Sequence, residues 1–576
     1  MKKELEKWII ISALVILSIV LLVVLPLGHD LWFHVYRIGA MATELRNNPW
    51  QIPIRMLSES YNGYGYGAAL YYGDLFLYIP AMLVCIGMKE VAAYKLFTVM
   101  ILWTTFGIAF ASARMMEKEN KTAIYFSLFY TFSSYGLLNL CIRSAIGESL
   151  AFAFLPLVIS SFWNILYRKP RRRNRILLGS AMAAIVMSHM LTFVLCVVLL
   201  CVWCAVDIKK VIIRDKLIEF IKAAVFMIGM SASFIFPLFE QMLYQKVQTP
   251  GNDDYQKQMF MNYSIDWMDY FIPYDMKKIV ASVFPVSWDL EYWHPGTIGL
   301  FAIMILGVGL IIKSRFSKRQ TGVMICSIGA LVLLGIKNVM EIVKEFMAFM
   351  QFPWRILTFV TLGLAFCGMW LVENMDTESK KKSRNLKLVL LLGTLGIAFL
   401  AIGPRYAYQI YIQKDNYEYI RENNPEIYHK YMIRYDKNGA DALYLPEGTY
   451  LYTYQDRGEV VSSNNENVEY QWQRRQKQID IQVQNNPYTD STLEVPLFIY
   501  KGYTAENTKG RCFPIEKSSN GLVNVVIGDY VGDIQIKYQG TLVQKISNII
   551  TLITMLGMIV MWKMSGSASG KNRLNL

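Results

Sequence analysis

The residues best suited to chemistry stand together directly after the first apolar stretch of the chain. The segment Gly28-His29-Asp30-Leu31-Trp32-Phe33-His34-Val35-Tyr36-Arg37 holds a carboxylate, two imidazoles and a guanidinium within ten residues. Partial desolvation at a lipid–water boundary raises the pKa of a carboxylate toward the range in which it can act as a general base. A guanidinium can hold a phosphate by a two-pronged contact. The segment therefore predicts acid–base and anion-binding chemistry at a membrane surface.

This segment fits a helix over residues 31–45. Positions four and seven residues after Asp30 share one helix face, so His34 and Arg37 would lie beside the carboxylate. A purely structural alternative has Asp30 capping the helix N-terminus. A second alternative is a divalent metal held by His29, Asp30 and His34, which this spacing alone supports weakly. An interfacial helix with solvated charges is the third.

Four further candidates stand at the ends of later apolar stretches. Arg143 and Glu148 share a short turn, where they either bind substrate or close the loop as an ion pair. His189 is the one histidine within its apolar stretch, and such a histidine is either a satisfied core residue or a site residue. Arg355 follows Pro353 and Trp354, and it either snorkels to lipid headgroups or binds a phosphate.

Composition and charge patterning indicate a polytopic membrane protein. Hydrophobic residues make up 54% of the chain, and the net charge of +14 is concentrated in short basic clusters between apolar runs. Cytoplasmic loops carry such an excess of Lys and Arg, so the charge reflects topology rather than nucleic-acid binding. With every basic cluster and both termini in the cytoplasm, we expect about 12 spans. They lie near 8–27, 91–113, 121–138, 148–167, 176–189, 190–206, 217–239, 297–313, 321–336, 353–373, 386–404 and 546–563.

Two assignments in this topology differ from a simple count of apolar runs. The segment Leu75 to Met88 contains Pro80 and is too short to span, so we expect an interfacial or re-entrant helix. The run 176–206 is too long for one untilted helix, and we expect two short helices that meet at an external turn at Ser188 and His189.

The chain divides into three parts. Residues 1–404 form the membrane domain, with a first external loop at 28–90, and 546–576 form the last span and a cytoplasmic tail. Residues 405–545 alternate polar and β-favouring residues between turn signals, which predicts an extracytoplasmic β-sandwich-like domain. The predicted strands are 468–472, 479–483, 493–500, 522–527 and 534–538. Most of the eight cysteines lie in or beside apolar runs, so no disulfide framework is expected.

Several short motifs resemble those of YfhO-like bacterial membrane proteins, some of which are labelled 6-pyruvoyl-tetrahydropterin synthase-related. The matching segments are Gly28-His-Asp-x3-His34-x2-Arg37, Pro53-x-Arg55, Asn62-Gly-Tyr-Gly-Tyr66, Tyr72-Gly-Asp74, Tyr78-x-Pro80, Arg143-Ser-Ala-x2-Glu148, Ser188-His189, Gln351-Phe-Pro-Trp-Arg355 and Tyr444-Leu-Pro446. These proteins belong with the GT-C type glycosyltransferases. The resemblance spans nearly the whole chain and is weaker in the β-rich tail.

The resemblance implies a GT-C-like multi-pass enzyme of the cell membrane with an external active face. It would move a sugar from a polyprenyl-phosphate donor to an envelope glycan, polymer or lipid, with Asp30 as base and His34 beside it. The other substrate-binding candidates are Arg37, Tyr66, Asp74, Arg143, Glu148, His189 and Arg355. A divalent metal is an open expectation. Two alternatives also stay open: a flippase for a lipid-linked saccharide, and a non-catalytic scaffold for envelope assembly.

Overall fold

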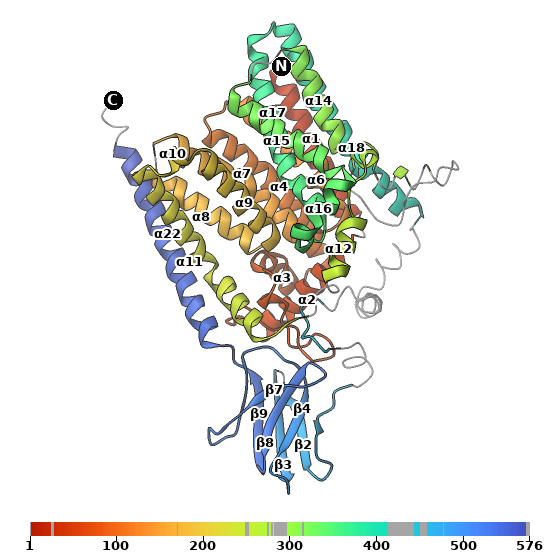
Figure 1. Ribbon diagram of the computed structural model, residues 1–576, viewed down its shortest axis with the longest axis vertical. Coiled ribbons are helices and arrows are strands. Elements are labelled where there is room, and N and C mark those ends of the chain that lie inside the picture. The colour runs from red at the N-terminus through yellow and green to blue at the C-terminus, as the bar shows by residue number, and fades with distance from the viewer. Residues whose placement is uncertain are drawn as a thin grey trace.

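The structure is a computed structural model with a helical body and a β-rich region beyond one end of it (Figure 1). It describes residues 2–24, 28–169, 171–247, 253–273, 276–277, 280, 296–313, 316–412, 443–449, 458–475 and 477–571. The start of the first helix and the far end of the last helix both lie at the end of the body away from the β strands.

Seven described helices are long and apolar enough to cross a membrane. They are α1 (Lys2–Val23), α4 (Glu90–Met115), α7 (Ile146–Tyr167), α11 (Arg214–Tyr244), α17 (Leu357–Asn374), α18 (Lys380–Ile412) and α22 (Leu542–Lys571). An eighth span is added if α15 (Lys318–Leu334) and α16 (Lys337–Met347), which are bent by 97°, count as one. The chain is thus a multi-pass membrane protein, although the predicted count of about 12 spans is not confirmed.

The difference in count comes from helices that are short for a bilayer. The predicted span at 121–138 is interrupted: α5 (Asn120–Thr131) is followed by α6 (Ser134–Leu137) and a single π-helical turn, η3 (Leu138–Ile142). At 1.5 Å per residue, the 12 residues of α5 cover about 18 Å, well below a hydrocarbon core of about 30 Å. The remaining short elements are α8 (Arg172–Val186), α9 (Met190–Val206), α10 (Ile208–Val211), α12 (Asp253–Asn262), η4 (Trp267–Tyr270), α14 (Ile298–Ile311), η5 (Ala348–Met350), η6 (Pro353–Ile356) and η7 (Met375–Thr377).

The structure contains the short helices that were expected within residues 176–206 and 75–88. The helices α8 and α9 end and begin on either side of Ser188 and His189, as expected. The proline-containing segment forms η2 (Leu75–Leu77) and the short helix α3 (Tyr78–Cys85). The expected helix after Asp30 is α2 (Leu31–Asn47), and η1 (Ala68–Leu70) lies between it and η2.

The β region consists of two antiparallel sheets around their own apolar core. One sheet has the order β1-β4-β8-β7, with β1 (Ser462–Ser463), β4 (Ser491–Phe498), β7 (Ile515–Lys517) and β8 (Leu522–Gly528). The other has the order β2-β3-β9-β5-β6, with β2 (Glu469–Arg475), β3 (Gln478–Asn485), β5 (Tyr503–Glu506), β6 (Cys512–Phe513) and β9 (Gly532–Tyr538). Each predicted strand overlaps an observed one. The helix α18 continues to Ile412, past the predicted boundary at 404.

The helices α7 and α17 are the most buried of the candidate spans, each with 83% of its apolar window inside the protein. Glu148 stands in the first turn of α7, and Arg355 lies in η6, directly before α17. Both charged residues therefore stand at the entrances of the central helices, where the surrounding helices fix their positions.

Candidate functional site

The start of the first external loop is pressed against the turn that follows η3. The backbone N–H of Asp30 donates a hydrogen bond to the carbonyl of Arg143 over 3.1 Å. A Cβ atom at Gly28 would stand only 2.3 Å from Ser144 Oγ and 2.5 Å from the Arg143 carbonyl carbon, so this approach requires glycine. Two segments more than a hundred residues apart are thus joined at one point.

A second close approach brings the Tyr72-Gly73-Asp74 segment to the junction of α8 and α9. A Cβ at Gly73 would lie 2.2 Å from the carbonyl oxygen of Met187. A Cβ at Gly147 would lie 2.1 Å from the Tyr72 hydroxyl and 2.6 Å from the Ser188 carbonyl oxygen. The 28–90 loop, the start of α7 and the α8–α9 junction therefore approach so closely at Gly73 and Gly147 that a Cβ atom would not fit at either position.

Glu148 is the centre of a buried polar cluster. Its carboxylate pairs with Arg143 at 2.9 Å, and it accepts hydrogen bonds from the Asn139 amide at 3.2 Å and from the Tyr135 hydroxyl. Arg143 also donates to the Asn139 side-chain oxygen at 2.6 Å. Arg355 Nε reaches the same carboxylate at 3.7 Å. The ion-pair alternative for Arg143 and Glu148 is therefore what the structure shows, with a second arginine added.

Two aromatic rings stack against this pair of arginines. The Arg143 guanidinium lies 4.4 Å from the centre of the Trp354 ring, and that of Arg355 lies 4.9 Å from the centre of the Phe352 ring. The two rings are stacked on each other at 4.8 Å. Arg355 also donates to the Met350 carbonyl. Both guanidinium groups are buried, and these contacts hold the turn before α17 in place, although Arg355 Nε has no hydrogen-bond acceptor among the described residues.

His189 occupies the N-cap position of α9. Its Nδ1 accepts a hydrogen bond from the Thr192 backbone N–H at 3.3 Å and lies 2.7 Å from the Thr192 hydroxyl. Burial is the main cause that lowers the pKa of His189 to about 3, and Glu148 only partly opposes it. The imidazole is therefore neutral at physiological pH. His189 caps a helix at the rim of the site, which matches the structural alternative for this residue.

Arg37 differs from the other arginines because its charge is buried without a hydrogen-bonding partner. It is 1% exposed, and among the described residues neither of its Nη atoms has an acceptor. Its guanidinium lies between the rings of Phe33 and Tyr72, at 4.9 and 5.0 Å from their centres. A buried, unpaired guanidinium is costly, so it indicates a site that binds an anion.

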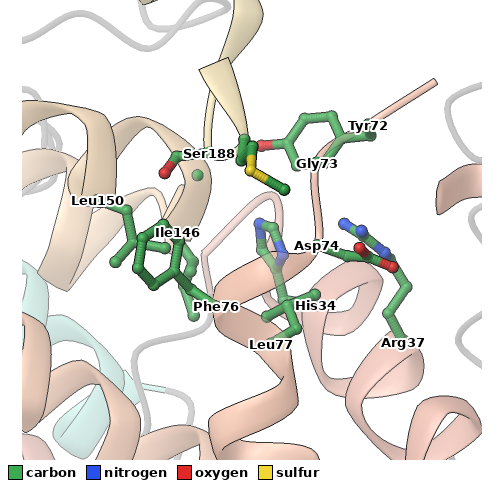
Figure 2. Close-up of a pocket in the computed structure, with 12 residues that line it drawn as sticks. His34, Arg37, Tyr72, Gly73, Asp74, Phe76, Leu77, Ile146, Leu150 and Ser188 are labelled. Atoms are coloured by element: carbon green, nitrogen blue, oxygen red, sulfur yellow. The ribbon is translucent and has the colours of Figure 1, made fainter. Parts of the chain in front are cut away.

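Arg37 lines a narrow cleft together with His34 and Asp74, with room for about one water molecule (Figure 2). The wall opposite these polar groups is formed by α7 and the α8–α9 junction, including Ile146, Leu150 and Ser188. The cleft thus lies between polar groups of the 28–90 loop and a mainly apolar wall.

The titratable groups of the cleft have shifted pKa values. Burial raises the pKa of Asp74 to about 6, although the positive charges of Arg37 and Arg55 oppose the shift. Burial and the adjacent Arg37 charge lower the pKa of His34 well below its ordinary value. His34 is 2% exposed, and its Nδ1 has no hydrogen-bond partner among the described residues. A neutral imidazole and a carboxyl group that titrates near neutral pH thus face the same space.

Asp30 stands at the N-cap position of α2, but its side chain makes no capping hydrogen bond. The capping alternative is therefore wrong for the side chain, although the position is right. The carboxylate is half-buried and interacts electrostatically with Arg143 and with Tyr72. His34 and Arg37 follow on the buried side of the same helix, as the spacing predicted.

Tyr66 lies outside the cleft, which corrects its assignment as a substrate-binding residue. It is 1% exposed, and its hydroxyl donates to the Leu443 carbonyl at 2.9 Å. Its ring packs against Tyr61 and inside the helical core, so no face is open to a sugar. The tyrosines near the site are Tyr72 and Tyr444, whose rings are 6.2 Å apart. Tyr444 belongs to the Tyr444-Leu-Pro446 motif, but no local sequence pattern indicated that its ring would lie near Tyr72.

The histidines and carboxylates do not form a metal centre in the described part of the chain. No group of three or more His, Cys, Asp or Glu side chains among those residues could hold a metal ion. His29, Asp30 and His34 are therefore not arranged as a metal-binding set here.

Comparison with known proteins gives structural matches only. No family model matches the chain, and no curated protein sequence matches it. The structure is similar to the arabinofuranosyltransferase AftD from Mycobacteria, with 14% identity and a TM-score of 0.41 over 69% of this chain and 27% of that one. It is also similar to the oligosaccharyltransferase of Archaeoglobus fulgidus, with 13% identity and a TM-score of 0.35 over 75% of this chain and 60% of that one. The chain thus spans about a quarter of the AftD chain, and similarities at these TM-scores carry no argument about its reaction.

Proposed function

We propose that this protein transfers a sugar from a polyprenyl-phosphate donor to a cell-envelope glycan, polymer or lipid at the external face of the membrane. The observation that carries the proposal is the buried guanidinium of Arg37, a residue of the cleft lining whose Nη atoms have no acceptor among the described residues. Phosphate oxygens are suitable acceptors for such a group. The apolar wall and the neighbouring membrane spans suit the hydrocarbon part of a lipid phosphate.

In the proposed reaction, an acceptor hydroxyl attacks the anomeric carbon of the donor sugar. Asp30 takes the hydroxyl proton, the new glycosidic bond forms, and the bond from the anomeric carbon to the phosphate oxygen breaks. The electron pair of that bond leaves on the lipid phosphate, where Arg37 stabilises the charge. His34 is neutral and donates or accepts a hydrogen bond beside the two groups. Asp74 contacts a sugar hydroxyl or shares the charge of Arg37.

Arg143, Glu148 and Arg355 are positioning residues in this proposal. Both guanidinium groups share the Glu148 carboxylate, and the cluster fixes the turn whose Arg143 carbonyl accepts a hydrogen bond from the Asp30 backbone N–H. The strand-rich region stands near the cleft through Tyr444, which stacks on Tyr71 at 6.0 Å. It would therefore bind or screen the acceptor.

The proposal is tested with purified protein in lipid nanodiscs and a radiolabelled polyprenyl-phosphate sugar. We expect release of the lipid phosphate and a labelled acceptor from an envelope extract, and we expect Asp30→Asn to abolish both. The matched control is Asp254→Asn in α12, an exposed aspartate outside the cleft, which should leave transfer unchanged. Unchanged transfer by Asp30→Asn would remove this residue from the mechanism. If the donor crosses the bilayer and no product forms, the proposed transferase activity is wrong and the protein is a flippase.

A further inference from the structure

The helix α16 is amphipathic and carries an apolar stripe that no described part of the protein covers. Ile342 and Phe346 of α16 and Phe349 of η5, which follows α16 directly, are 69%, 78% and 48% exposed. Their spacing of four and three residues places them on one side, because residues at these separations are neighbours on a helix surface. Large apolar side chains exposed in a row are uncommon on a surface that faces water.

The direction of α16 is set by its neighbour α15. The 17 residues of α15 cover about 26 Å and pack against the membrane-spanning helix α17. The axis turns by 97° between α15 and the segment that contains α16. If α15 runs across the bilayer, α16 therefore runs nearly parallel to the membrane plane.

The remaining surface of α16 is charged or packed against protein. Lys257 of α12 pairs with Glu345, and Glu341 pairs with Lys344. Val332 and Leu333, near the end of α15, are 40% and 51% exposed, so apolar surface continues from the spanning helix up to the bend. A helix that has an apolar stripe, charged flanks and this orientation fits the boundary between headgroups and acyl chains.

We propose that α16 and η5 form an interfacial segment whose Ile342, Phe346 and Phe349 insert into the acyl region of the outer leaflet. The inserted residues lie directly before the Gln351-Phe-Pro-Trp-Arg355 turn, so they fix the depth of Arg355 relative to the lipid headgroups. The partner of this surface is the lipid bilayer itself. The inference does not depend on the proposed sugar transfer.

The depth of α16 is measured with nitroxide labels in the full-length protein in nanodiscs. The background replaces the exposed cysteines Cys201, Cys326 and Cys512 with serine. Labels are placed at Phe346→Cys and, as a second probe of the stripe, at Ile342→Cys. The control is Glu341→Cys, which lies about 100° around the helix from Ile342.

We expect labels at 346 and 342 to collide readily with oxygen, which concentrates in acyl chains, and poorly with a water-soluble nickel chelate. The label at 341 should show the opposite preference by at least about threefold, because the chelate is excluded from hydrocarbon. Equal access of the chelate to all three labels would overturn the proposal, since the stripe would then face water. Stripe labels that are shielded from both reagents would also overturn it, because another protein surface would then cover them.

Discussion

Replacing Arg37 with methionine separates a binding role from a structural one. Two buried Nη groups without an acceptor each cost about 1–3 kcal/mol, and contacts with Phe33 and Tyr72 return about 0.5–2 kcal/mol. Methionine has a similar length and no polar atom, so Arg37→Met should remove the cost and keep most of the packing. We expect the folded state to gain about 1 kcal/mol, which is observed as a higher melting temperature in detergent micelles.

The same substitution should destroy the activity. A guanidinium that makes two charge-assisted hydrogen bonds to the leaving phosphate contributes about 1.5–3 kcal/mol through each of them. Their loss predicts a fall in kcat/KM of about 100-fold to 10,000-fold in the radiolabelled-donor assay. Stability and activity would therefore move in opposite directions, as is typical of residues that serve function at the expense of stability.

Arg143→Met is the matched comparison, because Arg143 is buried but paired. Removing it leaves Glu148 buried with its main ion pair broken, which should cost about 3–5 kcal/mol. We therefore expect a large fall in melting temperature for Arg143→Met beside a rise for Arg37→Met. If Arg37→Met lowered the melting temperature as much as Arg143→Met, Arg37 would be a structural residue and the anion-binding argument would be refuted.

Three further outcomes are expected. The pKa of Asp74 is raised to about 6 in the folded protein, so the native state loses stability as the pH rises from about 4 to 6. In thermal unfolding, we therefore expect Asp74→Asn to stabilise the protein at pH 7.5 and to do so much less at pH 4.5. Lys477→Met should lower stability by about 1–3 kcal/mol and speed proteolysis within the strand-rich region, because Lys477 pairs with the buried Glu44 of α2. Chelation with EDTA should leave sugar transfer unchanged, whereas a loss that Mg²⁺ or Mn²⁺ reverses would assign a metal to the site.

The local elements could be predicted from sequence because their signals are local. The alternation of residues in 479–483 and in 534–538 predicted a strand in each segment, and both strands are observed, as β3 and β9. Their antiparallel pairing comes from the structure alone. The turn at Ser188 and His189 followed from the length of one apolar run. The number of spans could not be obtained in this way, because an apolar run does not show where a helix such as α5 breaks.

The pairing of charges within the site could not be predicted from sequence. Spacing indicated that Arg143 and Glu148 could close a turn, but nothing local indicated that Arg355 would reach the same carboxylate. Only the three-dimensional arrangement shows that, within the described part of the chain, Arg37 is the arginine with two buried Nη atoms that lack an acceptor. The prediction that Tyr66 binds substrate failed for the same reason. Tyr66 and Tyr72 both stand beside glycines in the sequence, but of these two only Tyr72 lines the cleft.

Charge counting around the cleft connects these observations. The interacting groups include the carboxylates Asp30, Asp74 and Glu148 and the guanidinium groups Arg37, Arg55, Arg143, Arg355 and Arg405. With every one of these groups ionised, the guanidinium groups outnumber the carboxylates, and Arg37 has two buried Nη atoms without an acceptor among the described residues. An excess of buried positive charge favours an anionic ligand, and the proposed phosphate-bearing donor depends on this property.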